Sequence, residues 1–324
     1  MNSAIIGLGV IANVHVEAIK AIDGTIVSVC DIDLEKAKDF VKRHNLNCKI
    51  YNSYKAMLTK EKIDVVHICT PHYLHENMCI FALNHNINVL CEKPLCISLT
   101  GIDNILEAAK HSKAKIGVCL QNRYNESNLY VKNLLAKEKV IGGFATVLWG
   151  RDKKYYDSGA WRGKKRTEGG GVMINQALHT LDLMQWFCGM PTKVNASVFN
   201  VNHSYIEVED TARARFETKD GSFEFYASIC QNKDFPVQVL IETNTKQITI
   251  TDNNVIVNSK PKSFEEIPTQ SIKACYGNGH TKLISDFYDC VENNKKFDID
   301  AKEAAKVVKL VLGMYRSKGK DILI

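Results

Sequence analysis

Short apolar runs alternate with amphipathic segments through the first third of the chain. Five apolar runs have the length of buried parallel strands: residues 4–6, 25–30, 64–70, 88–91 and 115–120. Three segments between them place apolar side chains at helical spacing: residues 34–44, 73–84 and 98–111. This alternation predicts an α/β fold with a doubly wound parallel sheet, in which ligands bind beyond the carboxyl ends of the strands.

The pattern changes after Asn122. A helix and then a strand are predicted at residues 126–137 and 144–148. A charged and aromatic stretch without regular periodicity follows. The glycine triplet Gly169-Gly170-Gly171 then precedes a predicted helix at residues 172–187.

Apolar and polar residues alternate with a period of two through most of the remaining chain. This alternation predicts strands at residues 212–216, 223–227, 237–241, 247–252 and 255–258. The last two are expected to form a hairpin around Asn253-Asn254. Two helices are predicted at residues 281–293 and 301–318. The second part is therefore expected to be an α/β domain with an open, mostly antiparallel sheet, one face of which covers a core.

The first strand runs directly into a glycine turn. Gly7 permits a tight turn, Gly9 has no side chain to hold a pyrophosphate away from the backbone, and Ala12 allows close packing of helix and strand. Val10 and Ile11 begin the helix, whose unpaired N–H groups favour phosphate. Two glycines in a turn often serve only the turn, so the motif needs support from elsewhere.

That support comes from Asp31, at the end of the second strand. A carboxylate about 20 residues after the glycines accepts hydrogen bonds from a ribose hydroxyl. Asp33 is better placed to cap the following helix, which leaves Asp31 for the ribose. We predict NAD as the cofactor, preferred over NADP, because Asp31 repels a 2′-phosphate and Ile32 carries no positive charge.

The domain boundary is predicted where the pattern changes. Residues 1–122 would form the dinucleotide-binding domain, and residues 123–324 a domain for substrate binding and oligomerisation. A chain of 324 residues suits two such domains.

Composition narrows the choice of partners. The net charge of +6 is mild, and there is no basic tail or Arg-rich aromatic module, so we expect no nucleic acid partner. No apolar run is long enough to span a bilayer, and the first residues carry the fingerprint strand and not a signal peptide, so we expect no membrane association. The eleven cysteines include no C-x-x-C pair and are typical of a reducing compartment. We expect a cytoplasmic protein.

Polar residues at the strand ends are the first candidates for chemistry. Lys93, between Glu92 and Pro94, follows the strand at 88–91 and is expected to polarise a substrate oxygen or help move its proton. The alternative is a surface lysine. The segment from Thr70 and Pro71 to His75 is expected to border the same cofactor cleft. We find no convincing metal-ligand spacing and predict no metal.

The helix predicted after the glycine triplet carries a second candidate set. Asn175, His179 and Asp182 fall at spacings of four and three, which place them on one helical face. His179 is a candidate general base, although a lone helical histidine is more often structural. Asp182 would anchor the imidazole or pair with a distant lysine.

These motifs resemble the Gfo/Idh/MocA family, the superfamily of glucose–fructose oxidoreductase and inositol dehydrogenase. The resemblance covers essentially the whole chain and rests on the motifs 7–12, 70–75, Glu92-Lys93-Pro94 and the glycine-led His-x-x-Asp helix. It implies a Rossmann domain followed by an α/β domain whose open sheet often mediates oligomers. It also implies catalytic roles for Lys93 and His179. Asn175 stands where inositol dehydrogenases commonly carry aspartate.

The stretch before the glycine triplet is similar to a particular branch of this family. Tyr155-Tyr156, Trp161-Arg162 and Asn175-Gln176 look more like the sugar and nucleotide-sugar-acid dehydrogenases, which puts inositol in doubt as substrate. Arg162 would clamp a carboxylate or phosphate, as in a sugar acid, or pair with Glu168.

The predicted function is an NAD-dependent dehydrogenase that moves a hydride between a secondary alcohol of a sugar and the nicotinamide. The alternatives are a catalytically silent NAD-binding regulator and an NAD-dependent glycosidase. Lys93, His179 and Asn175 are the predicted catalytic residues. We assign to the cofactor Gly7, Gly9, Val10, Ile11, Ala12, Asp31, Thr70, Pro71, His75, Glu92 and Lys93. We assign to the substrate Lys93, Tyr156, Trp161, Arg162, Asn175 and His179.

The predicted sheet of the second domain has a second, polar face. It carries arginine and aromatic anchors of the kind that interfaces favour, at Arg213, Arg215, Glu224, Tyr226 and Gln238. We therefore predict a homodimer or homotetramer built through this face. The alternative is a solvated sheet face.

Overall fold

The computed structural model describes residues 1–252, 254–264 and 279–324, which form two compact units. The first unit contains residues 1–121 and 279–305. The second contains the described residues between 122 and 264, together with residues 306–324.

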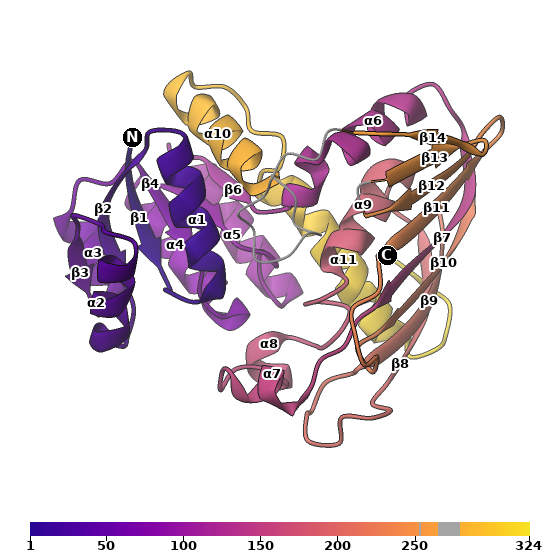
Figure 1. Ribbon diagram of the computed structural model, residues 1–324, viewed down its shortest axis with the longest axis horizontal. Helices are drawn as coiled ribbons and strands as arrows, with labels where there is room; N and C mark the ends of the chain where they lie inside the picture. Colours follow the sequence, from indigo (N-terminus) through magenta and orange to yellow (C-terminus); the bar gives the residue numbers. More distant parts are fainter. Residues whose placement is uncertain (253, 265–278) are drawn as a thin grey trace. The chain divides into compact units, whose positions relative to one another are not determined.

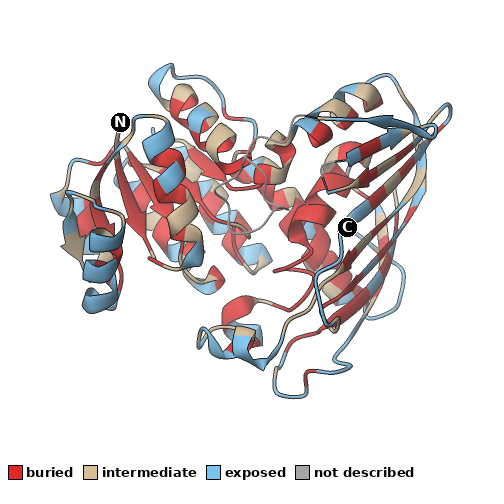
Figure 2. Ribbon diagram, viewed as in Figure 1, coloured by how far each residue is buried: buried red, intermediate tan, exposed pale blue. Residues whose placement is uncertain are grey.

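The first unit is built on a six-stranded sheet with the order β3-β2-β1-β4-β5-β6. All of its neighbouring strands are parallel: β1 (Asn2–Ile6), β2 (Thr25–Cys30), β3 (Lys49–Tyr51), β4 (Val65–Ile68), β5 (Asn88–Cys91) and β6 (Ile116–Val118). The central strands β1, β4 and β5 are almost wholly buried, because helices cover both faces (Figure 2). This confirms the predicted doubly wound α/β fold.

Helices connect these strands in the order of the chain. They are α1 (Val10–Ala21), α2 (Leu34–Arg43), α3 (Tyr54–Lys60), α4 (His75–Asn84) and α5 (Leu99–His111). Asp33 caps α2, as predicted, by accepting the Lys36 N–H at 3.1 Å. The sequence analysis did not predict β3 or α3, because β3 is a short edge strand without a buried apolar run.

The second unit contains a nine-stranded sheet with the order β14-β13-β12-β11-β7-β10-β9-β8-β15 (Figure 1). Among the strands described in this sheet, only the β7–β10 pair is parallel, so the prediction of a mostly antiparallel sheet is confirmed. The strands are β7 (Val140–Leu148), β8 (Lys193–Phe199), β9 (Thr211–Glu217), β10 (Ser222–Ser228), β11 (Gln238–Thr243), β12 (Gln247–Thr251), β13 (Asn254–Val257), β14 (Lys260–Lys262) and β15 (Ile322–Leu323).

Alternation along these strands separates a core face from an open face. Ala214 and Phe216 on β9, and Phe225 on β10, are buried, whereas Arg213 and Arg215 are exposed. Strands β12 and β13 pair as the expected hairpin, although Asn253 lies outside the described residues. The helices of this unit include α6 (Glu126–Leu135), α7 (Lys153–Asp157), α8 (Lys165–Glu168) and α9 (Leu178–Cys188).

The chain returns to the first unit near its end. Helix α10 (Gly279–Glu292) packs on α1 and buries Leu283, Ile284 and Phe287. The Val118 N–H of β6 donates to the Ile299 carbonyl at 3.1 Å. Periodicity identifies the apolar face of α10 but does not say which core that face covers, so a single boundary after residue 122 did not anticipate this return. Helix α11 (Ala301–Ser317) then leads back into the second unit.

Within the described parts of the chain, we find no helix of the length and apolar character needed to cross a membrane.

Candidate active site

The glycine turn links β1 to α1 in the first unit. Gly7 has φ +85°, and a Cβ there would lie 2.8 Å from the Cys69 carbonyl oxygen, so the position requires glycine. Gly9 is the N-cap of α1, and a Cβ there would meet no atom of residues 1–252, 254–264 or 279–324 within 4 Å. Ala12 is fully buried, and Val10 is 67% exposed. The open space beside Gly9, at a helix N-terminus, fits a pyrophosphate.

Asp31 lies at the end of β2 beside this turn. Its carboxylate accepts the Leu8 N–H at 2.9 Å and pairs with the Lys36 ammonium at 2.7 Å. Burial opposes ionisation of Asp31, but the hydrogen bonds from Lys36 and from the Leu8 and Asp33 amides outweigh it and lower its pKa. An ionised acceptor at this position fits a ribose hydroxyl. The sequence analysis missed Lys36, which lies in the first turn of α2, next to the end of β2.

His75 joins the loops that follow β4 and β5. It is fully buried, and its ring nitrogens lie 2.8 Å from the Thr70 carbonyl oxygen and 2.7 Å from that of Pro94. Burial lowers the pKa of His75. The side chain therefore fixes the two segments, 70–71 and 93–94, that the sequence assigned to the cofactor cleft.

Glu92 is the centre of a buried polar cluster in the first unit. Its Oε1 atom lies 2.9 Å from His15 Nε2 and 3.4 Å from His280 Nε2. Burial disfavours the charged carboxylate, but the interactions with His15 and His280 outweigh it and hold the pKa of Glu92 well below its usual range. The backbone N–H of Lys93 donates to the other carboxylate oxygen at 3.2 Å.

This cluster extends away from Glu92 through further hydrogen bonds. His15 Nδ1 lies 2.8 Å from His67 Nδ1, and His67 Nε2 lies 2.8 Å from the Tyr288 hydroxyl. Cys119 also approaches, so that His15, Glu92 and Cys119 offer donor atoms within 4.8 Å of one another. The sequence spacing did not predict this grouping. The cluster holds Glu92, the residue immediately before Lys93.

In the second unit, the segment after the glycine triplet differs from the prediction. Helix α9 begins at Leu178, not at residue 172, and Asn175 lies in the turns before it. Asn175 therefore does not share a helical face with His179 and Asp182, as the spacing had predicted. His179 is 8% exposed in the first turn of the helix.

Glu209 binds the backbone of the segment that precedes α9. Its carboxylate accepts the Gly171 N–H at 2.9 Å and the Met173 N–H at 3.1 Å. A Cβ at Gly171 would lie 1.8 Å from the Glu209 carbonyl oxygen, so only glycine permits this approach. The Tyr315 hydroxyl also donates to Glu209 at 2.7 Å. Glu209 thus holds the backbone that precedes His179, and burial raises its pKa.

The Tyr155 hydroxyl connects Arg162 with the segment that contains Asn175 and Gln176. Its hydroxyl accepts from Arg162 Nη1 at 2.5 Å, from Gln176 Nε2 at 3.1 Å and from Asn175 Nδ2 at 3.2 Å. The Arg162 guanidinium lies 4.3 Å from the centre of the Tyr155 ring and 4.6 Å from that of Trp161. Asn175 Nδ2 also donates to Glu168.

Asp182 lies in the interior of the second unit. Its two oxygens accept from Arg123 Nε at 2.8 Å and Arg123 Nη2 at 2.6 Å, and Gln185 donates to it at 3.1 Å. Of the two roles considered for Asp182, this bidentate pair favours structural pairing, with an arginine in place of the expected lysine.

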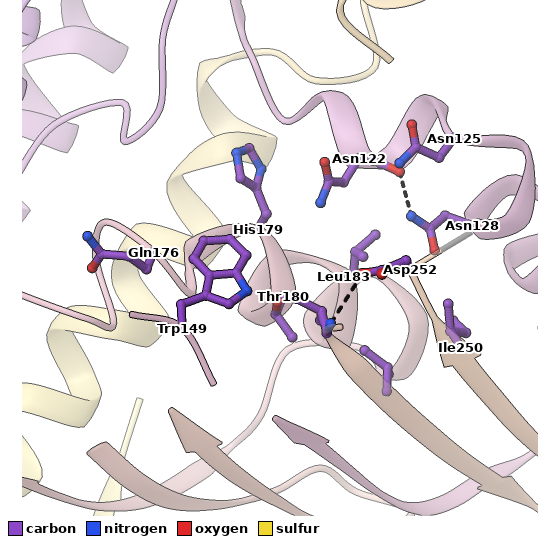
Figure 3. Close-up of a pocket in the computed structure, with 12 residues that line it drawn as sticks. Asn122, Asn125, Asn128, Trp149, Gln176, His179, Thr180, Leu183, Ile250 and Asp252 are labelled. Atoms are coloured by element: carbon purple, nitrogen blue, oxygen red, sulfur yellow. Dashed lines mark hydrogen bonds between the residues drawn. The ribbon is translucent and has the colours of Figure 1, made fainter. Parts of the chain in front are cut away.

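A pocket in the second unit collects several of these side chains (Figure 3). Its lining residues are Asn122, Asn125, Asn128, Trp149, Gln176, His179, Thr180, Leu183, Val237, Val239, Ile250 and Asp252. His179 is thus the predicted catalytic residue that lines it. Tyr156 is buried among the rings of Tyr155, His203 and Tyr205 and is not among the residues that line this pocket.

Two models of known protein families match the chain. Residues 1–120 match the GFO/IDH/MocA oxidoreductase family with an NAD-binding Rossmann fold, and residues 133–242 match the GFO/IDH/MocA C-terminal domain. The chain belongs to the GFO/IDH/MocA family, which confirms the resemblance seen in its motifs. Its first unit is an NAD-binding Rossmann domain.

Individual relatives are named as dehydrogenases. Inositol 2-dehydrogenase of Salmonella typhimurium is 25% identical over 189 residues, 57% of this chain and 54% of that protein, so the match spans about half the length of the relative. D-apiose dehydrogenase of Paraburkholderia graminis is 23% identical over 97% of this chain and 86% of its own length. The WlbA dehydrogenase of Chromobacterium violaceum, solved with NADH and UDP-GlcNAcA, is 25% identical with a TM-score of 0.88 and covers all of this chain and 96% of its own.

Proposed function

We propose that this protein is an NAD-dependent dehydrogenase that oxidises a secondary alcohol of a sugar or polyol, or reduces the corresponding ketone. The observation that carries the proposal is His179, a titratable side chain that lines the pocket of the second unit among amides. The relatives are named for inositol and for apiose, and one is bound to UDP-GlcNAcA, so they support this class of reaction without selecting one substrate.

In the first unit, the residues present fit NAD. The Gly9 turn and the N-terminus of α1 would hold the pyrophosphate, and Asp31 would hold a ribose hydroxyl. NAD, when bound, supplies the hydride acceptor. Thr70, Pro71, Glu92 and Lys93 follow neighbouring parallel strands, whose carboxyl ends line the usual ligand crevice of such sheets.

The protein's own residues would handle the proton. An alcohol carbon can lose hydride only as its hydroxyl loses a proton, so a base must reach that oxygen. We assign this role to His179, and we assign to Lys93 the stabilisation of the developing alkoxide. Asn175 is tied to Glu168 and Tyr155, so its contribution would be to position the substrate side of the site.

A substrate panel tests this proposal. Purified protein is mixed with NAD and with sugars, sugar acids, inositols or nucleotide sugars, and NADH formation is followed by absorbance. We expect turnover with at least one member of the panel. Normal NAD binding with no turnover across the panel, in either direction of the reaction, would contradict the dehydrogenase and favour a silent NAD-binding regulator.

A further inference from the structure

The pocket of the second unit has an unusual set of polar groups. Four of its lining residues are amides: Asn122, Asn125, Asn128 and Gln176. None of the twelve lining residues is a lysine or an arginine. Figure 3 shows the three asparagines together on one side, with His179, Trp149 and Gln176 across from them. This wall can form hydrogen bonds, but among the residues that the structure describes it offers no lysine or arginine for an anion.

The amide oxygens of this wall are buried acceptors. Asn122 Oδ1, Asn128 Oδ1 and Gln176 Oε1 have no hydrogen-bond partner within the described parts of the chain. Asn128 is 3% exposed and Gln176 is 6% exposed. Their amide nitrogens are already engaged: Asn128 Nδ2 donates to the Asn122 carbonyl at 2.7 Å, and Gln176 Nε2 donates to Tyr155. Each oxygen is therefore left to accept a bond from a ligand.

The charged residues in and near the pocket also disfavour an anionic ligand. Asp252, an exposed lining residue, adds a carboxylate. Arg151 lies 5.0 Å from the centre of the Trp149 ring, but it is paired with Asp234 at 2.7 Å and does not line the pocket. Arg162 lies over Tyr155 and Trp161 and is also outside the lining. A ligand carboxylate or phosphate on this wall would meet oxygen acceptors and a negative charge.

We infer that this wall selects a ligand that presents hydroxyl donors and no acidic group, so that the substrate is a neutral sugar or polyol and not a sugar acid. Hydroxyl groups pair with the buried amide oxygens, the face of Trp149 packs on the ring carbons, and Val239 and Ile250 supply apolar contact. This inference rests on the proposed dehydrogenase function and names the class of its substrate.

Matched pairs of neutral and acidic sugars test the inference. Glucose is compared with glucuronate and galactose with galacturonate, with myo-inositol as a further neutral ligand. We expect kcat/KM to be at least ~10-fold higher for the neutral member of each pair that reacts, since a like-charge contact costs about that much in affinity. Equal or better turnover of the acidic member would overturn the inference.

Two substitutions sharpen the test. Asn125→Lys adds a cation to the pocket, where the Asn125 side chain makes no capping hydrogen bond, and should raise the ratio of acid to neutral kcat/KM at least ~10-fold. Asn125 is the N-cap of α6. Asn133→Lys makes the same exchange at an exposed position of α6 and should leave the ratio of acid to neutral kcat/KM unchanged. Asn128→Leu, checked for thermal stability, should raise KM for the neutral substrate. An unchanged ratio in Asn125→Lys would count against the inference.

Failure of the dehydrogenase proposal has a different signature. If NAD binds but no sugar in the panel reacts, the same pairs are measured by thermal shift in the presence of NADH. Stabilisation by the neutral members alone would support the inference about the pocket even though the proposed reaction had failed. Stabilisation by the acids, alone or equally, would overturn it.

Discussion

At the scale of single residues, His179 and Lys93 are the expected centre of the chemistry. Removing a general base typically lowers the rate by ~10²–10⁴. We predict that His179→Ala and Lys93→Ala each lose that much kcat and retain NAD binding by fluorescence titration, because neither residue is assigned to the pyrophosphate or the ribose. Exposed His111→Ala and Lys113→Ala are the matched controls. Near wild-type turnover in either active-site variant would remove that residue from its role.

Cofactor choice is a second question at this scale. Asp31 should give at least a ~10-fold preference for NAD over NADP, because a 2′-phosphate would meet its carboxylate at a cost of ~1 kcal/mol or more. Lys36, 2.7 Å from Asp31, should change that preference once the carboxylate is gone. We predict that Asp31→Ala improves NADP use relative to NAD, and that Asp31→Ala combined with Lys36→Ala improves it less, because the double variant removes the repulsion but also the cation. Steady-state kinetics with NAD and with NADP measure this preference. Equal kcat/KM for the two cofactors in the wild type would contradict the role of Asp31.

Residue types could be predicted from the sequence better than their partners. Gly7, Gly9 and Asp31 could be found because strand, turn and helix fix their spacing. Glu207, Glu209 and Asp210 stand almost side by side in the sequence, and nothing there says which of them turns inward. In the structure, Glu207 accepts the Lys165 N–H at 3.1 Å, Glu209 holds the glycine segment, and Asp210 binds residues 201–203. These bonds depend on tertiary contacts that local pattern does not encode.

At the scale of elements, the loop from residue 200 to 210 supports the stretch before α9. Asp210 accepts the N–H groups of Val201 at 2.9 Å, Asn202 at 2.7 Å and His203 at 3.1 Å. The Glu207 N–H donates to the Gly163 carbonyl at 2.7 Å. The loop is therefore tied both to itself and to the segment that carries Arg162.

This arrangement predicts how the free energy of unfolding declines at acidic pH. Burial opposes ionisation of Asp210, but the amides of Val201 and Asn202 and the His203 side chain outweigh it and lower its pKa below the ordinary 3.8. A carboxylate with a lowered pKa stabilises the fold above its unfolded pKa of about 3.9, and that stabilisation is lost as the pH falls toward the folded pKa. We predict that Asp210→Asn lowers stability at neutral pH and flattens its decline below about pH 4, as measured by urea unfolding. Asp152→Asn, at an exposed helix cap, should keep the decline.

Helix and strand types could be predicted where the periodicity extends over many residues, but helix boundaries could not. Helix α9 begins at Leu178 and not at residue 172, and the turns before it are bound by Glu209, distant in sequence, which accepts the N–H groups of Gly171 and Met173. The sequence analysis passed over strand β8, although Val194 and Ala196 alternate there with Asn195 and Ser197 and are buried. The strand pairs with β9 and β15, which lie further along the chain.

At the scale of the whole molecule, the open face of the nine-stranded sheet predicts self-association. Phe144 and Tyr226 are 40% and 38% exposed on it. Arg213 pairs in register with Tyr226, and Glu224 with Phe144. Aromatic residues and arginine on a flat sheet are typical of an interface, so we predict a homodimer or homotetramer through this face.

Light scattering checks the oligomer. Wild-type protein should be larger than a monomer at micromolar concentration. Phe144→Asp combined with Tyr226→Asp should shift it toward the monomer, since two charges would be buried at the interface, without loss of circular dichroism signal. Lys219→Asp, at an exposed turn, should not change the mass. A wild-type monomer would leave the face as a solvated surface.

The packing of α10 on α1 has a consequence for how the protein is made. A ribosome releases the glycine turn, Asp31 and Lys93 early, yet Phe287, Phe297 and Ile299, which pack against β6, come among the last forty residues. The first unit therefore stays incomplete, with β6 uncovered, until most of the second unit has been synthesised. A chain truncated before residue 279 would complete neither unit. A chimera made by joining two relatives at residue 122 would pack its α1 against an α10 from the other relative.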